Sequence, residues 1–304
     1  MTAERFNEHR DLMIGVAYRI LGSAADAEDV VQEAWLRWSE IDPAEVGNPR
    51  AYLVRVTTNL AIDRLRKVKS LRETYVGPWL PEPIITAPDV AEQAEVADSV
   101  ELALLVVLET LSPLERAVFV LREAFGFSHA EIAEMIGRGE PAVRQLARRA
   151  RDHVRERRPR FDVDRARRRE VTERFIGAAT GGDLDGLMAM LAAEVTLVGD
   201  GGGKARAPLR ILEGSRNVAA FLAAIATEDG VIRFLQSIGA PLTADIDMEI
   251  TDVNGGPGVV LSAEGRVITV ISLVISGGLI ETVYLIANPD KIARLSGPPA
   301  DEEA

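Results

Sequence analysis

The stretch at residues 127–158 limits what this chain can fold into more than any other part of it. Ser128 and Glu131 have the spacing of a capping box, in which each side chain satisfies a free backbone group at the start of a helix. Gly137 then interrupts the pattern, and Pro141 suits the first turn of a new helix. The stretch therefore predicts two helices joined by a tight turn.

The second of these helices has two different faces. Apolar residues recur at helical spacing along one face: Val143, Leu146, Ala147, Ala150 and Val154. Arginines recur along another: Arg144, Arg148, Arg151 and Arg155. The apolar face can seat this helix on the first one, and guanidinium groups can bond phosphates and guanine edges in a major groove. A basic helix that is only solvated is the alternative, but the capped helix before it favours a DNA-binding helix-turn-helix.

The charges of the 304 residues are unevenly distributed, although the net charge is −12. Residues 144–169 hold twelve Arg against four acidic residues, and residues 50–72 hold seven Lys or Arg against one Asp. From residue 170 onward nineteen acidic residues face nine basic ones. Because salt screens charges over about 8 to 10 Å, the two basic stretches can act locally within an acidic protein.

Several classes of site are excluded by composition. There is no Cys, so disulfides and thiolate sites cannot form, and the three His lack metal-ligand spacing. We expect no metal and no cofactor. The charged N-terminus is not typical of a signal peptide, and no apolar run reaches the roughly 18 residues of a membrane span. We expect a cytoplasmic protein without membrane contact.

The first seventy residues predict three helices. Residues 5–21 form one amphipathic pattern, Ser23 can cap a second helix with an acidic face, and Asn48 can cap a third. The third helix carries four polar residues on one face, Arg55, Asn59, Asp63 and Arg66. That face could contact bases, and pairing among its own side chains is the alternative.

Residues 71–98 contain four prolines and no helical period, which predicts a linker between domains. Tyr75, Val76, Trp79 and Leu80 are nevertheless too apolar for a linker exposed to water. We expect a groove to bury them, with a merely solvated linker as the alternative. Two further helices, at 101–110 and after Ser112, lead to the helix-turn-helix.

The pattern changes near residue 164. Helices are predicted at 165–180, from Asp183 to Leu191 and near 215–227, and strands at 231–239, 242–253 and 258–288. Alternating Val and Ile between Gly turns predict a bent antiparallel sheet in an α+β cone. Asp200 could act as a base with Asp245 or Asp247, but this part holds no His and no clear acid–base pair, so we do not expect an enzyme.

Two motifs in the first part are specific to a known family. DAEDVVQEAWLRW at 26–38 and NPRAYLVRVTTNLAIDRLR at 48–66, followed by the helix-turn-helix, resemble the extracytoplasmic-function sigma factors, which are bacterial transcription initiation factors. The resemblance covers about residues 1–160. It implies two all-α domains, at 1–70 and 99–160, that bind promoter DNA and core RNA polymerase through the clamp helices of its largest subunit and its flap.

The resemblance also implies roles for individual residues. Polymerase contacts would come from Asp26, Glu28, Asp29, Gln32 and Glu33. Contacts to the promoter −10 element would come from Arg55, Asn59, Asp63 and Arg66, with the loop at 39–47 holding a flipped base, and contacts to the −35 element from Arg144, Gln145, Arg148, Arg149 and Arg151.

Residues 165–292 resemble the SnoaL-like branch of the nuclear-transport-factor-2 superfold, followed by an acidic tail at 293–304. A subgroup of these sigma factors carries such an extension as a fused regulator, which implies that no separate anti-sigma protein is needed. Three motifs carry this resemblance: Tyr75, Val76, Gly77, Pro78, Trp79, Leu80 and Pro81 in the linker; Asp200, Gly201, Gly202, Gly203 and Lys204; and Asn288, Pro289, Asp290 and Lys291.

The expected function is therefore promoter recognition and opening with core RNA polymerase, regulated by the C-terminal domain and without catalysis. We expect the linker motif to dock near the glycine-rich segment at 200–204. Whether the pocket of such a domain holds a small ligand stays open. A helix-turn-helix regulator that senses a small molecule, and a cyclase or isomerase with a DNA-binding part, are the alternatives.

Overall fold

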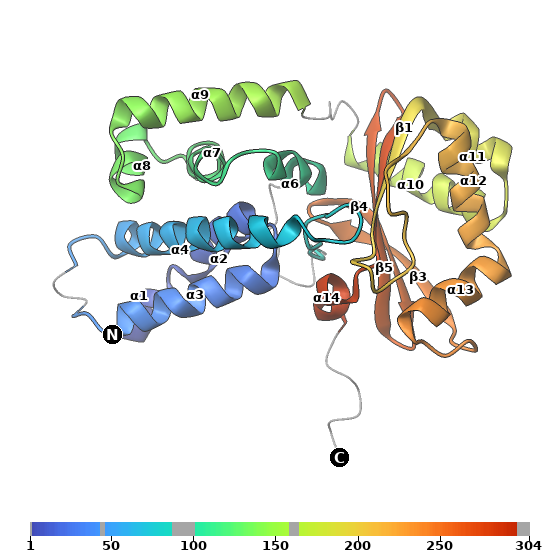
Figure 1. Ribbon diagram of the computed structural model, residues 1–304, viewed down its shortest axis with the longest axis horizontal. Coiled ribbons are helices and arrows are strands. Elements are labelled where there is room, and N and C mark those ends of the chain that lie inside the picture. The colour runs from blue at the N-terminus through green and yellow to red at the C-terminus, as the bar shows by residue number, and fades with distance from the viewer. Residues whose placement is uncertain (1, 43–45, 87–100, 158–163, 297–304) are drawn as a thin grey trace, which may run out of the picture. The chain divides into compact units, whose positions relative to one another are not determined.

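The computed structural model describes residues 2–42, 46–86, 101–157 and 164–296, which fall into two compact units (Figure 1). The first unit contains the described residues up to Glu73 together with 101–157, and the second contains 74–86 together with 164–296. The described linker from residue 74 to residue 86 thus belongs to the second unit. No helix within the described ranges has the length and apolar character that crossing a bilayer requires.

The first unit is entirely helical. Its N-terminal helices are α1 (Thr2–Asn7), α2 (Arg10–Leu21), α3 (Ala24–Ser39) and α4 (Pro49–Arg72). Ser23 and Asn48 cap α3 and α4, accepting hydrogen bonds from the Asp26 and Ala51 amides, both at 3.0 Å. The prediction of one helix over 5–21 was wrong, because the chain breaks between α1 and α2 at Glu8 and His9.

The remaining helices of this unit include the predicted helix-turn-helix. They are α6 (Leu102–Glu109), α7 (Pro113–Phe119), a π-helical turn (Val120–Ala124), α8 (His129–Ile136) and α9 (Glu140–Arg157). Both Ser112 and Ser128 form complete capping boxes. Gly137 ends α8 in a left-handed conformation (φ 63°), which glycine adopts without strain.

A buried ionic cluster joins the helices of the first unit. Arg116 on α7 is fully buried, and its Nε donates to the Arg19 carbonyl on α2 at 2.9 Å. The Glu109 carboxylate on α6 accepts from both Arg116 and Arg72. Burying these charges is tolerable only because each guanidinium meets a carboxylate or a carbonyl.

The second unit is an α+β domain, so the predicted fold class is confirmed. Its helices are α10 (Arg165–Thr180), α11 (Leu184–Met190), α12 (Ser215–Ala226), α13 (Glu228–Ile238), α14 (Pro289–Ile292) and a 3-10 turn (Ala293–Leu295). Its strands are β1 (Leu191–Asp200), β2 (Leu212–Glu213), β3 (Ile246–Val253), β4 (Gly256–Ala263), β5 (Arg266–Ser276) and β6 (Leu279–Ile286), in the order β2-β1-β6-β5-β4-β3.

Two predictions for this unit were wrong. The run at 231–239 belongs to helix α13, which Thr227 caps by accepting from the Gly230 amide at 3.1 Å. Its apolar residues Val231, Phe234, Leu235 and Ile238 pack together at helical spacing. The sheet is also not wholly antiparallel, because β1 pairs in parallel with β6.

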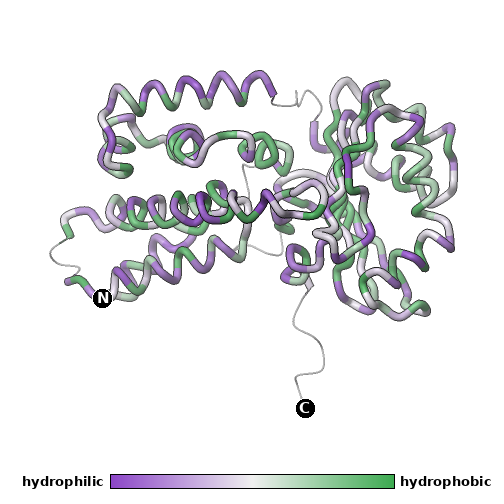
Figure 2. The backbone as a smooth tube through the Cα atoms, in the orientation of Figure 1, coloured by the Kyte–Doolittle hydropathy of each residue, from purple (hydrophilic) through white to green (hydrophobic). Residues whose placement is uncertain are grey.

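The core of the second unit lies between the sheet and helices α10 to α12 (Figure 1). It includes Val195, Leu197, Val283 and Leu285, all nearly or fully excluded from water. The tube coloured by hydropathy shows hydrophobic stretches in both the strands and the helices of this unit (Figure 2). Apolar burial on this face supplies most of the stability of the unit.

We predict that Leu197→Ala destabilises the second unit by about 2–5 kcal/mol, because it opens a cavity in this core. Leu279→Ala is the matched control: this side chain is 41% exposed, so the expected change is about 0.5 kcal/mol or less. Calorimetry of the full chain measures both. Equal shifts of the transition for the two variants would contradict this account of the core.

Candidate functional site

The arginine face of α9 is exposed, and most of it is already ion-paired. Arg144 lies 2.6 Å from Glu140, Arg151 2.8 Å from Glu123, and Arg148 and Arg149 lie 3.8 and 3.9 Å from Asp152 and Glu115. The Arg148 side chain is 85% exposed, and Gln145 is exposed as well. Val143, Ala147, Ala150 and Val154 are buried as predicted, so the predicted DNA-facing side chains do point away from the core.

The predicted −10 face of α4 is partly occupied by another helix of the same unit. The Asn59 amide donates to the Met135 carbonyl on α8 and to the Arg55 carbonyl, both at 2.9 Å. Asp63 pairs with Arg66 at 2.8 Å, and Arg55 lies over the Tyr52 ring. Asn59 therefore has both amide hydrogens engaged, whereas the three charged residues of this face stay exposed.

The acidic face of α3 is tied to α4 by a residue that the sequence analysis missed. Arg64 lies 2.5 Å from Asp26 and 3.2 Å from Asp29, and the hydrogen bond to Asp26 raises the pKa of Arg64. Glu33 pairs with Arg37 on the same helix, whereas Glu28 and Gln32 lie exposed beside a shallow hollow. No local pattern reveals Arg64, because its partners lie more than thirty positions away.

In the second unit, one buried carboxylate holds three separate segments of the chain. Asp200 ends β1 and is fully buried. Its Oδ2 lies 2.6 Å from Lys291 Nζ and accepts from the Leu80 amide at 2.8 Å. Its Oδ1 accepts from the Tyr75 hydroxyl at 2.5 Å and from the Gly202 amide at 3.1 Å. The predicted linker, glycine-rich and C-terminal motifs therefore meet at Asp200.

The buried Lys291 ammonium completes this arrangement. It donates to the Leu80 carbonyl and lies 3.9 Å from the centroid of the Trp79 ring, a cation–π geometry. Asn288 donates to the Tyr75 hydroxyl at 2.8 Å. Burial and the hydrogen bond to Asp200 raise the pKa of the Tyr75 hydroxyl far above its usual value, so Tyr75 is a neutral donor to a charged acceptor.

The glycines next to Asp200 allow close approach of the other segments. A Cβ on Gly203 would lie 3.1 Å from the Val76 Cβ, and one on Gly202 would lie 2.4 Å from Asn288. The outer edge is an exposed ion pair at 2.6 Å between Lys204 and Asp290. Among the remaining motif residues, Pro81 and Gly201 are buried and Pro78 is partly buried. Gly77 has a positive φ of 84°, and Pro289 is the first residue of α14.

The linker continues along β3, which the sequence analysis did not predict. The Thr86 amide donates to the Asp252 carbonyl at 2.7 Å, and the Asn254 amide donates to the Ile84 carbonyl at 2.8 Å. Ile85 forms a bridge with Val253. The described linker is thus held over residues 75–86, and its predicted continuation to residue 98 lies outside the described residues.

The geometry does not favour Asp200 as a catalytic base. Its carboxylate is saturated by four donors and is not part of the lining of the apolar cavity of this unit. Asp245 and Asp247 are exposed. Within the described residues no group of His, Asp or Glu could hold a metal ion.

Comparison with known proteins identifies the family. The model for Sigma-70 region 2 matches residues 5–70, and that for Sigma-70 region 4 matches residues 101–154. The sigma factor SigJ of Mycobacterium tuberculosis is 37% identical over 307 residues, covering 99% of this chain and 96% of SigJ. The chain belongs to the extracytoplasmic-function RNA polymerase sigma factors.

Other relatives agree with this assignment. The sigma factor SigI of the same organism is 38% identical over 186 residues, covering 60% of this chain and 64% of SigI. The crystal structure of SigJ matches with a TM-score of 0.75 and 36% identity over 95% of this chain and 97% of SigJ. The expected sigma factor fold is confirmed, and an ordinary helix-turn-helix regulator is not favoured.

We predict that Tyr75→Phe loosens the linker, because a hydrogen bond to a charged group contributes about 1.5–3 kcal/mol. Hydrogen exchange of the Leu80 amide should accelerate about tenfold or more. The control is Tyr284→Phe: this tyrosine is buried, its hydroxyl has no hydrogen-bond partner among the described residues, and burial raises its pKa to about 12. Unchanged exchange of the Leu80 amide in Tyr75→Phe would show that the Tyr75–Asp200 hydrogen bond does not hold the linker.

We also predict that Arg148→Gln lowers the salt dependence of promoter binding by the holoenzyme. Losing one phosphate contact should reduce the slope of log affinity against log salt by about 0.9. Arg174→Gln, an exposed arginine on α10, is the control and should leave the slope unchanged. Filter binding over a salt series gives both slopes, and equal slopes would exclude Arg148 from the interface.

Proposed function

We propose that this sigma factor directs core RNA polymerase to promoters and that its second unit sets this activity by holding the linker. The observation that carries the proposal is the buried Asp200–Lys291 pair, which binds the linker through Tyr75 and Leu80. We infer that a change at this pair alters how the linker between the two DNA-binding regions is held.

The contacts of α9 are compatible with binding DNA. Its arginines are paired only with exposed carboxylates, and exposed pairs contribute about 0–1 kcal/mol. Phosphates can replace these carboxylates at little cost. We infer that Arg144, Gln145, Arg148, Arg149 and Arg151 contact the −35 element.

Contacts to the −10 element require a rearrangement. Asn59 must release the Met135 carbonyl before its amide can reach a base. We infer that binding to polymerase separates α4 from α8 and so frees Asn59, which then contacts the −10 element together with Arg55, Asp63 and Arg66, already exposed in the free chain. The base-holding loop at 39–47 lies partly outside the described residues, since 43–45 are not described.

Polymerase binding is assigned to the α3 face with Asp26, Glu28, Asp29, Gln32 and Glu33. Glu28 and Gln32 are exposed, whereas Asp26 and Asp29 are oriented by Arg64. A fixed acidic surface suits a basic partner surface, because orienting the side chains beforehand reduces the entropy lost on binding. Three expectations stay predictions: that the protein is not an enzyme, that it needs no separate anti-sigma protein, and that it is cytoplasmic.

Run-off transcription with purified core polymerase tests the proposal. The unmodified chain should produce transcripts from selected promoters, and Asp200→Asn should change their amount severalfold because Lys291 loses its buried partner. Asp247→Asn, an exposed acid of the same unit, is the control. Absence of transcripts with the unmodified chain would refute the proposed function, and equal output from both variants would refute the regulation.

A further inference from the structure

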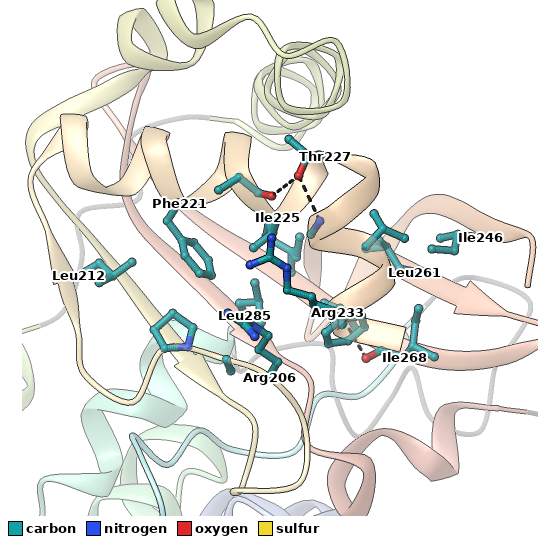
Figure 3. A pocket seen from close by; sticks show the side chains of 18 residues that line it. Arg206, Leu212, Phe221, Ile225, Thr227, Arg233, Ile246, Leu261, Ile268 and Leu285 are labelled. Atoms are coloured by element: carbon teal, nitrogen blue, oxygen red, sulfur yellow. Dashed lines mark hydrogen bonds between the residues drawn. The ribbon is translucent and has the colours of Figure 1, made fainter. Parts of the chain in front are cut away.

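We propose that the cavity of the second unit binds an apolar monocarboxylate and that the loop at 201–211 transmits its occupancy to the linker. The cavity measures about 620 Å³, within the range of small-molecule sites (Figure 3). The inference rests on the regulatory part of the proposed function and names the kind of ligand that would act there.

The walls of the cavity select an apolar ligand body. They come from α12, α13, strands β2 to β6 and the loop at 206–208, and most of the lining side chains are hydrocarbon. Figure 3 shows Phe221, Ile225, Leu261 and Leu285 around the hollow, at positions along these elements. An alkyl chain would replace water at these walls, which is favourable at about 25 cal/mol per Å² of buried apolar area.

The charges of the lining select an anionic head group. Arg206 and Arg233 line the cavity, whereas no acidic residue does. Arg233 pairs with Asp229 on its own helix. For Arg206 the described residues supply no carboxylate at ion-pair distance, although this part of the chain has nineteen acidic residues against nine basic ones. A carboxylate can bind such a guanidinium through two parallel hydrogen bonds.

The loop that carries Arg206 also contacts the linker. Its residues Ala207 and Pro208 line the cavity beside Arg206. A Cβ on Gly77 of the linker would lie 3.7 Å from the Leu209 Cα, and Gly203 faces Val76. One short segment thus forms a wall of the cavity on one side and a support for the linker on the other.

The loop is packed against β1 and bonded to α13, so that a movement of Arg206 also moves the loop residues that contact the linker. A Cβ on Gly199 would lie only 2.6 Å from the Pro208 ring, so β1 and the loop are closely packed. The Arg206 amide donates to Ser237 Oγ on α13 at 3.0 Å. A ligand that holds Arg206 and α13 together therefore fixes the loop against which Val76 and Gly77 rest.

Titration calorimetry of the full chain with decanoate, decanol and decyltrimethylammonium tests the ligand class. We expect decanoate to bind, decanol to bind about tenfold more weakly, and the cation to bind least. Arg206→Gln should weaken decanoate binding about tenfold, because one charge-assisted contact is lost. The control is Arg216→Gln, an exposed arginine of α12 outside the lining, with unchanged affinity.

Hydrogen exchange of residues 75–86, with and without decanoate, tests the coupling. We expect several-fold slower exchange when decanoate is bound, and no slowing in Arg206→Gln at the same concentration. Equal binding of decanol and decanoate, or no binding of either, would overturn the ligand class. Binding that leaves the linker exchange unchanged or faster would overturn the coupling. Neither assay contains polymerase, so these results are independent of run-off transcription.

Discussion

The structure of the second unit depends on an ion pair that could not be buried without the linker. Removing the Asp200 carboxylate and the Lys291 ammonium from water costs several kcal/mol for each ion, and their mutual attraction repays it only if their other hydrogen-bonding groups are satisfied. Tyr75 and Leu80 supply those partners. The linker is thus part of the fold of this unit. Leu80 is buried as expected, but the expected burial of Val76 was wrong, because this side chain is 51% exposed.

The first unit uses a similar solution. The fully buried Arg116 bonds the Arg19 carbonyl, and Glu109 joins it to Arg72, so helices from both sigma regions share one ionic cluster. The Asn59 contact to Met135 adds to this packing. The face of α4 that carries Asn59 is consequently in contact with α8 of the helix-turn-helix.

Local signals identified much of the architecture. The capping residues Ser23, Asn48, Ser112 and Ser128 mark real helix starts, because each cap involves atoms within three residues. Helix α13 was missed because its short apolar run fits a strand as well as a helix, and the division into α1 and α2 was missed because apolar spacing continues across the break. The parallel pairing of β1 with β6 joins segments nearly ninety residues apart, beyond any local pattern.

The sequence alone predicted the helix-turn-helix and the division into a helical part and an α+β part, because these depend on periodicity and capping. It also identified the two sigma motifs and the three motifs that meet at Asp200, because these are recognised by residue order. Only the folded chain brings Tyr75, Leu80 and Lys291 to one carboxylate, orients Asp26 by Arg64, and places Arg206 beside an apolar cavity. Those relations join residues up to two hundred positions apart, and long-range packing decides them.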